Sequence, residues 1–95
     1  TLLLVGLADD WTPAAPCQQL ESAGPPWVKV LAYEGAHHGF DGPSPVRLRT
    51  DVPNGVRPGA GVHVGGDPAA RQAAQQALLQ ALEKAFAAPL DAALD

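Results

Sequence analysis

The sequence predicts an α/β fold built on parallel strands. Three segments predict it: an apolar run at residues 1–5, a strand-like run at 25–33, and a strongly helical segment at 67–88. An apolar run without alternation is typical of a strand covered on both faces, as in a parallel sheet between helices. A strand, a helix and a second strand within 33 residues indicate a βαβ unit with a right-handed crossover.

The first strand is followed by an acidic turn and a short helix. Glycine and two aspartates break the apolar run in "GLADDW", and residues 12–24 have the composition of a helix. Thr12 is expected to cap this helix, and Gly24 to end it. Pro16 must lie in the first turn, or the helix begins later.

The second strand is predicted from the β-branched and aromatic residues of segment 25–33, with two prolines delaying its start. Segment 41–67 is rich in proline and glycine and shows neither a helical nor a strand period. We therefore expect a long insertion loop there. The pattern leaves open whether this insertion is an ordered lid or edge segment or a flexible loop.

The final helix has the clearest signals. Asp67 is a suitable N-cap and Pro68 suits the first helical position. Leu78, Leu82 and Phe86 recur every four residues and form an apolar stripe that needs a sheet to cover. The tail that follows, residues 89–95, is expected to fray.

Chain length, net charge and cysteine count restrict the class of protein. The 95 residues make one small domain, which we read as a single partial domain over 1–95. A net charge of −4 and only six Lys and Arg, without a basic run, argue against nucleic acid as a partner. The apolar run near the start is too short for a membrane span. One cysteine, Cys17, excludes an internal disulfide and fits a cytoplasmic protein.

Two strands do not complete an open α/β sheet. The fully apolar first strand needs a neighbour on each side, and the chain supplies one. We therefore expect the other strands to lie outside this chain, which begins with Thr1 rather than Met, or to come from a second copy. Pairing of the open sheet edge with a second copy would give a homodimer.

Polar residues follow both predicted strands. Asp9 and Asp10 come after the first, and His37 and His38 after the second. The carboxyl ends of parallel strands lie at one edge of a sheet, so an aspartate and a histidine should meet there. A carboxylate fixes the tautomer of an imidazole and stabilises its cation, which is the orienting half of a nucleophile–His–Asp triad. The sequence has no Gly-x-Ser-x-Gly elbow to carry the nucleophile.

Two segments, "LLLVGLADDWTPAAPCQQL" and "VKVLAYEGAHHGFD", resemble the C-terminal part of the dienelactone hydrolase family, within the α/β-hydrolase fold. The family has a Gly-x-x-Asp-x-x-x-Pro turn and a Tyr-x-x-Ala-x-His-x-Phe segment. The matching residues are Gly6, Asp9 and Pro13 in the first and Tyr33, Ala36, His38 and Phe40 in the second. The resemblance covers residues 1–41 and the final helix, whereas segment 41–67 is longer than the family pattern.

The resemblance implies the C-terminal part of a three-layer α/β-hydrolase sandwich, with Asp9 as the triad acid and His38 as the base. The parent protein would hydrolyse a small-molecule ester or lactone without a metal or organic cofactor. His38 would take a proton from a serine or cysteine located upstream. This chain alone is expected to be inactive. Trp11 and His37 are candidate substrate-binding residues.

Other readings remain open. The chain could be an inert fragment that associates with itself. It could instead be a metal-binding module, although adjacent histidines on extended backbone point to opposite sides. The candidate ligands would be His37, His38, Asp41 and His63. Arginines of the insertion could also bind a substrate carboxylate; they are Arg47, Arg49 and Arg57.

Overall fold

The chain forms a small mixed α/β structure. The structure is a computed structural model that describes residues 1–94, with the side chains of residues 1–87. The elements in order are β1 (Leu2–Gly6), α1 (Ala15–Ala23), β2 (Lys29–Tyr33), β3 (Arg47–Arg49), β4 (Val62–Val64) and α2 (Pro68–Leu94).

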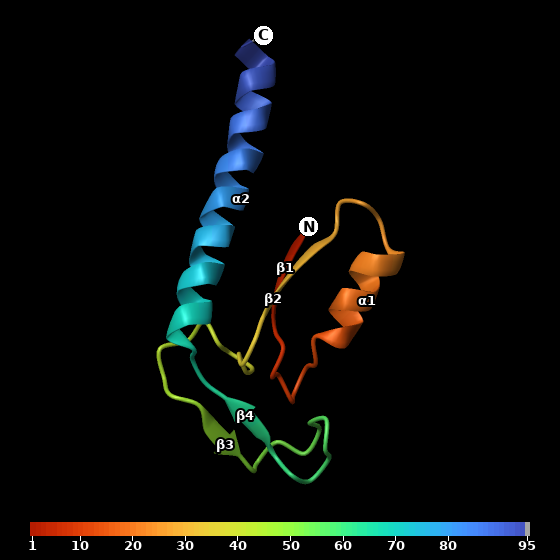
Figure 1. Cartoon of the computed structure of the whole chain (residues 1–95), viewed down its shortest axis with the longest axis vertical. Helices are drawn as coiled ribbons and strands as arrows, with labels where there is room; N and C mark the ends of the chain where they lie inside the picture. The colour runs from red at the N-terminus through yellow and green to blue at the C-terminus, as the bar shows by residue number, and fades with distance from the viewer. Residues whose placement is uncertain (95) are drawn as a thin grey trace.

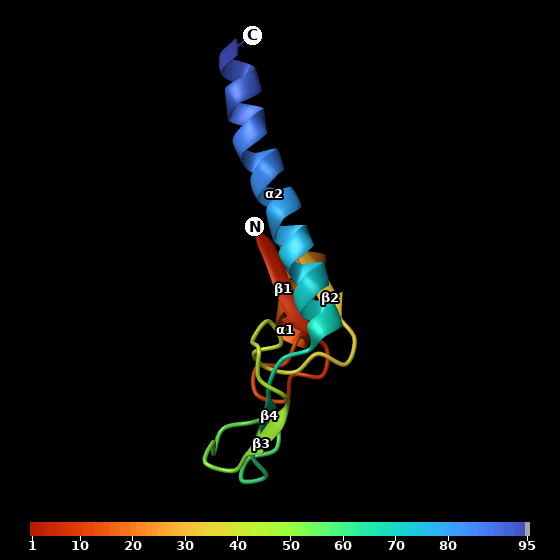
Figure 2. The same cartoon turned by 90° about the vertical axis from the view of Figure 1, so that its left-hand side faces the viewer.

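Strands β1 and β2 pair in parallel, as predicted. Their register runs from Leu2 opposite Lys29 to Gly6 opposite Tyr33. The two strands lie between the helices, with α1 on one side and α2 on the other (Figures 1 and 2). The α/β class and the parallel βαβ unit are therefore confirmed, and both strands end at the same edge of the sheet.

The boundaries of the first helix and the second strand differ from the prediction. Helix α1 begins after Ala14, which makes no side-chain capping bond, so the assignment of Thr12 as the cap is wrong. The Thr12 side chain is instead engaged by Asp9. Gly24 follows the last helical residue, as expected. Strand β2 starts only at Lys29 because Val28 N–H donates to the carbonyl of Pro25 and closes a turn.

The sequence predicts a loop without regular structure over the insertion at 41–67. The structure shows that this prediction is wrong. The insertion contains β3 and β4, which pair antiparallel with Leu48 opposite His63. Val62 is fully buried and Val52 nearly so, which indicates that this segment is packed. Strands of three residues are too short to show a period between so many prolines and glycines. Figure 1 places the β3–β4 ladder beyond the ends of β1 and β2.

The core lies where α2 begins to cross the sheet. Ala36 and Phe40 pack there against two alanines of α2, Ala70 and Ala74, with Leu4 and Tyr33 partly buried around them. The Asp67 carboxylate accepts a hydrogen bond from Ala70 N–H at 3.0 Å, so the predicted N-cap is confirmed. The small alanine side chains on this face let α2 pack against the loop that follows β2.

The apolar stripe of α2 is only partly covered. Leu78 and Leu82 line a groove beside the sheet, and Leu4 and Leu31 line it from the sheet. The two leucines of α2 nevertheless remain exposed. Phe86 is 74% exposed. A sheet of two strands is too narrow to cover the stripe, and α2 extends past it (Figures 1 and 2). The tail that was expected to fray continues as helix to Leu94, and Asp95 lies outside the described residues.

Among the residues that the structure describes, no helix is both long enough and apolar enough to cross a lipid bilayer.

Candidate active site

The turn after β1 and the loop after β2 are joined by main-chain hydrogen bonds. Ala8 N–H donates to the carbonyl of Ala36 at 2.9 Å, which continues the strand pairing beyond Gly6. A Cβ atom on Gly6 would lie 2.3 Å from that same carbonyl oxygen, so only glycine permits this approach. The close contact brings the residues that follow β1 next to those that follow β2.

Asp9 is held by its own turn. Its Oδ1 accepts hydrogen bonds from the N–H groups of Trp11 at 2.9 Å and Thr12 at 2.8 Å. Its Oδ2 accepts from the Thr12 hydroxyl at 3.1 Å and lies 3.1 Å from His38 Nδ1. The Asp9 side chain is 11% exposed. Both carboxylate oxygens therefore have partners, which fixes the oxygen that faces the imidazole.

His38 is positioned by backbone and by an aromatic ring. The next residue, Gly39, has a φ of 72°, which favours glycine and turns the chain directly after the histidine. The His38 carbonyl accepts a hydrogen bond from Gly65 N–H at 3.0 Å. The Trp11 ring lies 4.6 Å from the imidazole, centroid to centroid, at a tilt of 40°. The imidazole is 34% exposed, so solvent or a substrate can reach it.

The pairing assigns roles to the two ring nitrogens of His38. A carboxylate only accepts hydrogen bonds, so Nδ1 carries the proton in the bond to Asp9. In the neutral imidazole Nε2 is then the acceptor. An acceptor nitrogen on an oriented, half-exposed imidazole can take a proton from a hydroxyl or thiol brought next to it.

A second aspartate–histidine pair adjoins the first. Asp10 Oδ2 lies 2.6 Å from His63 Nδ1, and Asp10 Oδ1 accepts from His63 N–H at 2.8 Å. Burial alone would raise the pKa of Asp10, but the hydrogen bonds from His63 and its positive charge outweigh this and lower that pKa. The sequence analysis names His63 only as a candidate metal ligand. The alternation of apolar and polar residues in "VHV" is the sequence signal that His63 lies on a strand.

No family model, curated protein or solved structure matches this chain. The interpretation of the site therefore depends on the geometry of Asp9 and His38 and on the residue patterns of the two loops that carry them.

The other candidate site residues divide between the two pairs. Trp11 packs on His38, and the Arg49 guanidinium lies 5.7 Å from the Trp11 ring centroid. The His37 ring lies 5.5 Å from that of His63 and so belongs to the second pair. Arg49 is bound to Asp51 at 2.7 Å, and this pairing raises the pKa of the guanidinium.

The four residues considered as metal ligands are not gathered into one site. His38 is bound to Asp9, whereas His63 is bound to Asp10. Within the part of the chain that the structure describes, no three side chains of His, Cys, Asp or Glu are placed to share a metal ion.

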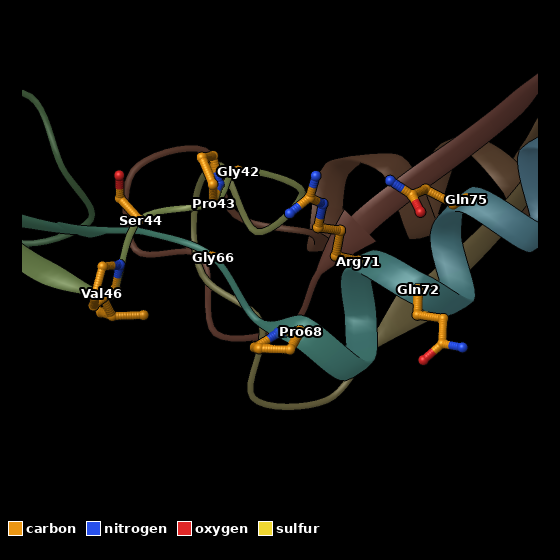
Figure 3. Close-up of a pocket in the computed structure, with 10 residues that line it drawn as sticks. Gly42, Pro43, Ser44, Val46, Gly66, Pro68, Arg71, Gln72 and Gln75 are labelled. Carbon is orange, nitrogen blue, oxygen red and sulfur yellow. The ribbon is translucent and has the colours of Figure 1, made fainter.

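An open cavity of about 600 Å³ lies where α2 begins, apart from both pairs (Figure 3). It is lined by loop residues 42–46 and by Arg71, Gln72 and Gln75 of α2. Arg71 and Gln75 project from one side of the helix and Gln72 from the other. Neither Asp9 nor His38 lines this cavity, so it is not part of the candidate active site.

Proposed function

We propose that this chain is the C-terminal portion of an ester or lactone hydrolase of the dienelactone hydrolase type, with the α/β-hydrolase fold. In this proposal Asp9 and His38 are the acid and the base of a nucleophile–His–Asp triad. One observation carries it: Asp9 Oδ2 and His38 Nδ1 lie 3.1 Å apart at the carboxyl ends of adjacent parallel strands. The nucleophile, a serine or cysteine, comes from a segment outside this chain.

The mechanism uses both nitrogens of the imidazole. Nε2 of His38 takes the proton of the nucleophile as this attacks the carbonyl carbon of the ester. The carbon–oxygen bond to the alcohol then breaks, and the imidazolium returns the proton to the leaving oxygen. Water, deprotonated in the same way, then attacks the acyl-enzyme; the bond to the nucleophile breaks, the carboxylic acid is released, and the imidazolium returns the proton to the nucleophile. Asp9 accepts the hydrogen bond from Nδ1–H throughout, stays ionised and stabilises the imidazolium cation.

Neighbouring residues have subsidiary roles in this proposal. Trp11 packs on the imidazole and restricts its tilt, and its remaining surface contributes to the acyl pocket. His37 lies toward the second pair, at the rim of the site. The substrate is a small ester or lactone, no metal or organic cofactor takes part, and we place the enzyme in the cytoplasm.

The first experiment is an intact-mass measurement combined with a p-nitrophenyl acetate assay on one preparation. A protein of about 9.8 kDa, the mass of this chain, should show no triad-dependent turnover. A larger protein that contains the chain should turn over the ester and should form an acyl-enzyme on a residue outside it. An acyl group found on His38 itself, or turnover that survives removal of this imidazole, would contradict the proposal.

A further inference from the structure

The insertion at 41–67 contacts both loops of the candidate site through one strand. His63 of β4 is bound to Asp10, in the turn that carries Asp9. The residue after His63, Val64, forms an isolated parallel bridge with His38, and Gly65 N–H donates to the His38 carbonyl. Three consecutive residues of the insertion thus join the acid turn to the histidine loop.

Asp10 is anchored to the insertion at three atoms. Its carboxylate accepts from His63 Nδ1 at 2.6 Å and from His63 N–H at 2.8 Å. Its carbonyl accepts from Val56 N–H at 2.8 Å. Asp10 directly follows Asp9, and neighbouring Cα atoms are joined at a fixed spacing of about 3.8 Å. A displacement of Asp10 is therefore transmitted to Asp9, whose carboxylate must stay within hydrogen-bond reach of His38.

We propose that His63 is a positioning residue: by holding Asp10, it fixes the turn that presents Asp9 to His38. The insertion then stabilises the site by connecting the acid turn to the histidine loop, rather than forming a separate module. The catalytic consequence of this role rests on the proposed function, since it concerns the same Asp9–His38 pair. The geometry itself can be tested in this chain without turnover.

The effect of His63 is expected to be local. The His63 side chain is 47% exposed and the Asp10 side chain 34%, and exposed ion pairs contribute little to global stability. The main-chain bonds from Gly65 and Val56 do not involve the imidazole and remain when it is removed. Loss of the side chain should therefore loosen the acid turn and leave the fold in place.

The test is NMR observation of the His38 Nδ1 proton in the 95-residue chain. His63→Ala removes the side-chain bond from Nδ1 to Asp10 and keeps the main-chain bond from His63 N–H, and His63→Asn restores an N–H donor near the place of Nδ1. Arg57→Ala is a control, because Arg57 is exposed in the same insertion and forms no side-chain hydrogen bond to Asp10 in the described structure. In His63→Ala we expect the Nδ1 proton to exchange roughly tenfold faster, as for loss of about one hydrogen bond. The original chain, His63→Asn and Arg57→Ala should agree, and the melting temperatures of all four should be similar.

Unchanged exchange of the Nδ1 proton in His63→Ala would overturn the proposal. If that variant fails to fold, His63→Phe keeps a ring without the donor and must show the same faster exchange. This test is independent of the proposed function. A parent protein without esterase activity would overturn the proposed function and leave the NMR result intact. An active parent protein, together with unchanged exchange in His63→Ala, would support the proposed function and overturn the positioning role of His63.

Discussion

At the scale of single residues, the arrangement of Asp9 explains why one of two adjacent aspartates faces His38. The N–H groups of Trp11 and Thr12 bind Oδ1 and leave Oδ2 directed at the imidazole. Asp10 points instead to His63. Within this turn the two carboxylates point in different directions, and each binds a different histidine.

Asp9→Asn in the parent protein should preserve the fold and lower kcat by a factor on the order of 10⁴. The amide can donate to Nδ1 and so favours the wrong imidazole tautomer, and it brings no charge to stabilise the cation. Steady-state hydrolysis of p-nitrophenyl acetate measures the change. Glu34→Gln is the matched control, since Glu34 is exposed after β2, and it should keep the original rate.

His38→Ala should lower kcat at least as much as Asp9→Asn. Circular dichroism of both variants should match that of the original protein. Near-full activity in either folded variant would show that the pair is structural rather than catalytic.

Thr12 provides a finer test of the same geometry. Its Oγ1 lies 3.1 Å from both Asp9 Oδ2 and His38 Nδ1. Thr12→Val removes the hydroxyl at nearly constant volume and should cost about 1 kcal/mol of unfolding free energy, the usual value for one hydrogen bond. Thr12→Ser keeps the hydroxyl and should retain most of this unfolding free energy. Urea denaturation of the three chains measures the difference, and equal stability of Thr12→Val and the original chain would remove Thr12 from the network.

At the scale of secondary-structure elements, the sequence predicts an element correctly where it has an uninterrupted apolar run or a capping residue next to the helix start. The apolar run at 1–5 predicted β1, the β-branched and aromatic residues of 25–33 predicted its parallel partner β2, and Asp67 marked the start of α2. Thr12 is not the cap because α1 begins only after Ala14, and both the N–H and the hydroxyl of Thr12 donate to Asp9 instead. Competition between local hydrogen bonds of this kind is decided by geometry that a residue pattern does not contain.

The insertion shows the other limit of sequence reading. Strands β3 and β4 have three residues each, and the pairing of Leu48 with His63 joins positions 15 apart. The Asp10–His63 bond spans 53 residues. The meeting of Asp9 and His38 could be predicted because both follow strands of one βαβ unit. The second pair could not, because nothing local places β4 beside the acid turn.

A matched pair of phenylalanines tests the description of the core. Phe40 is 9% exposed and packs with Ala36 against α2, whereas Phe86 is 74% exposed. Phe40→Ala should destabilise the chain by about 3 kcal/mol or more. Phe86→Ala should change the unfolding free energy by less than about 0.5 kcal/mol in dilute solution. Thermal melts at low concentration measure both, and similar losses would mean that α2 packs differently.

At the scale of the whole molecule, the helices cover a sheet of only two strands. The groove between the β1–β2 sheet and α2 is lined by Leu4, Leu31, Leu78 and Leu82, and the two leucines of α2 are 48% and 42% exposed. A groove lined by exposed leucines is a candidate interaction surface. In the proposed parent, further strands of the sheet would cover it. For the isolated chain, the surface that remains is the candidate self-association face.

We therefore expect the isolated chain to associate through this groove as its concentration rises. Sedimentation velocity should show a mass above 9.8 kDa at high concentration and the monomer mass on dilution. Leu82→Glu places a charge in the groove and should shift the chain to monomer. Leu20→Glu is the control, because Leu20 is 49% exposed on α1, outside the groove, and this change should leave association unaltered. A chain that remains monomeric throughout would exclude self-association, whereas equal effects of the two glutamates would place the contact elsewhere.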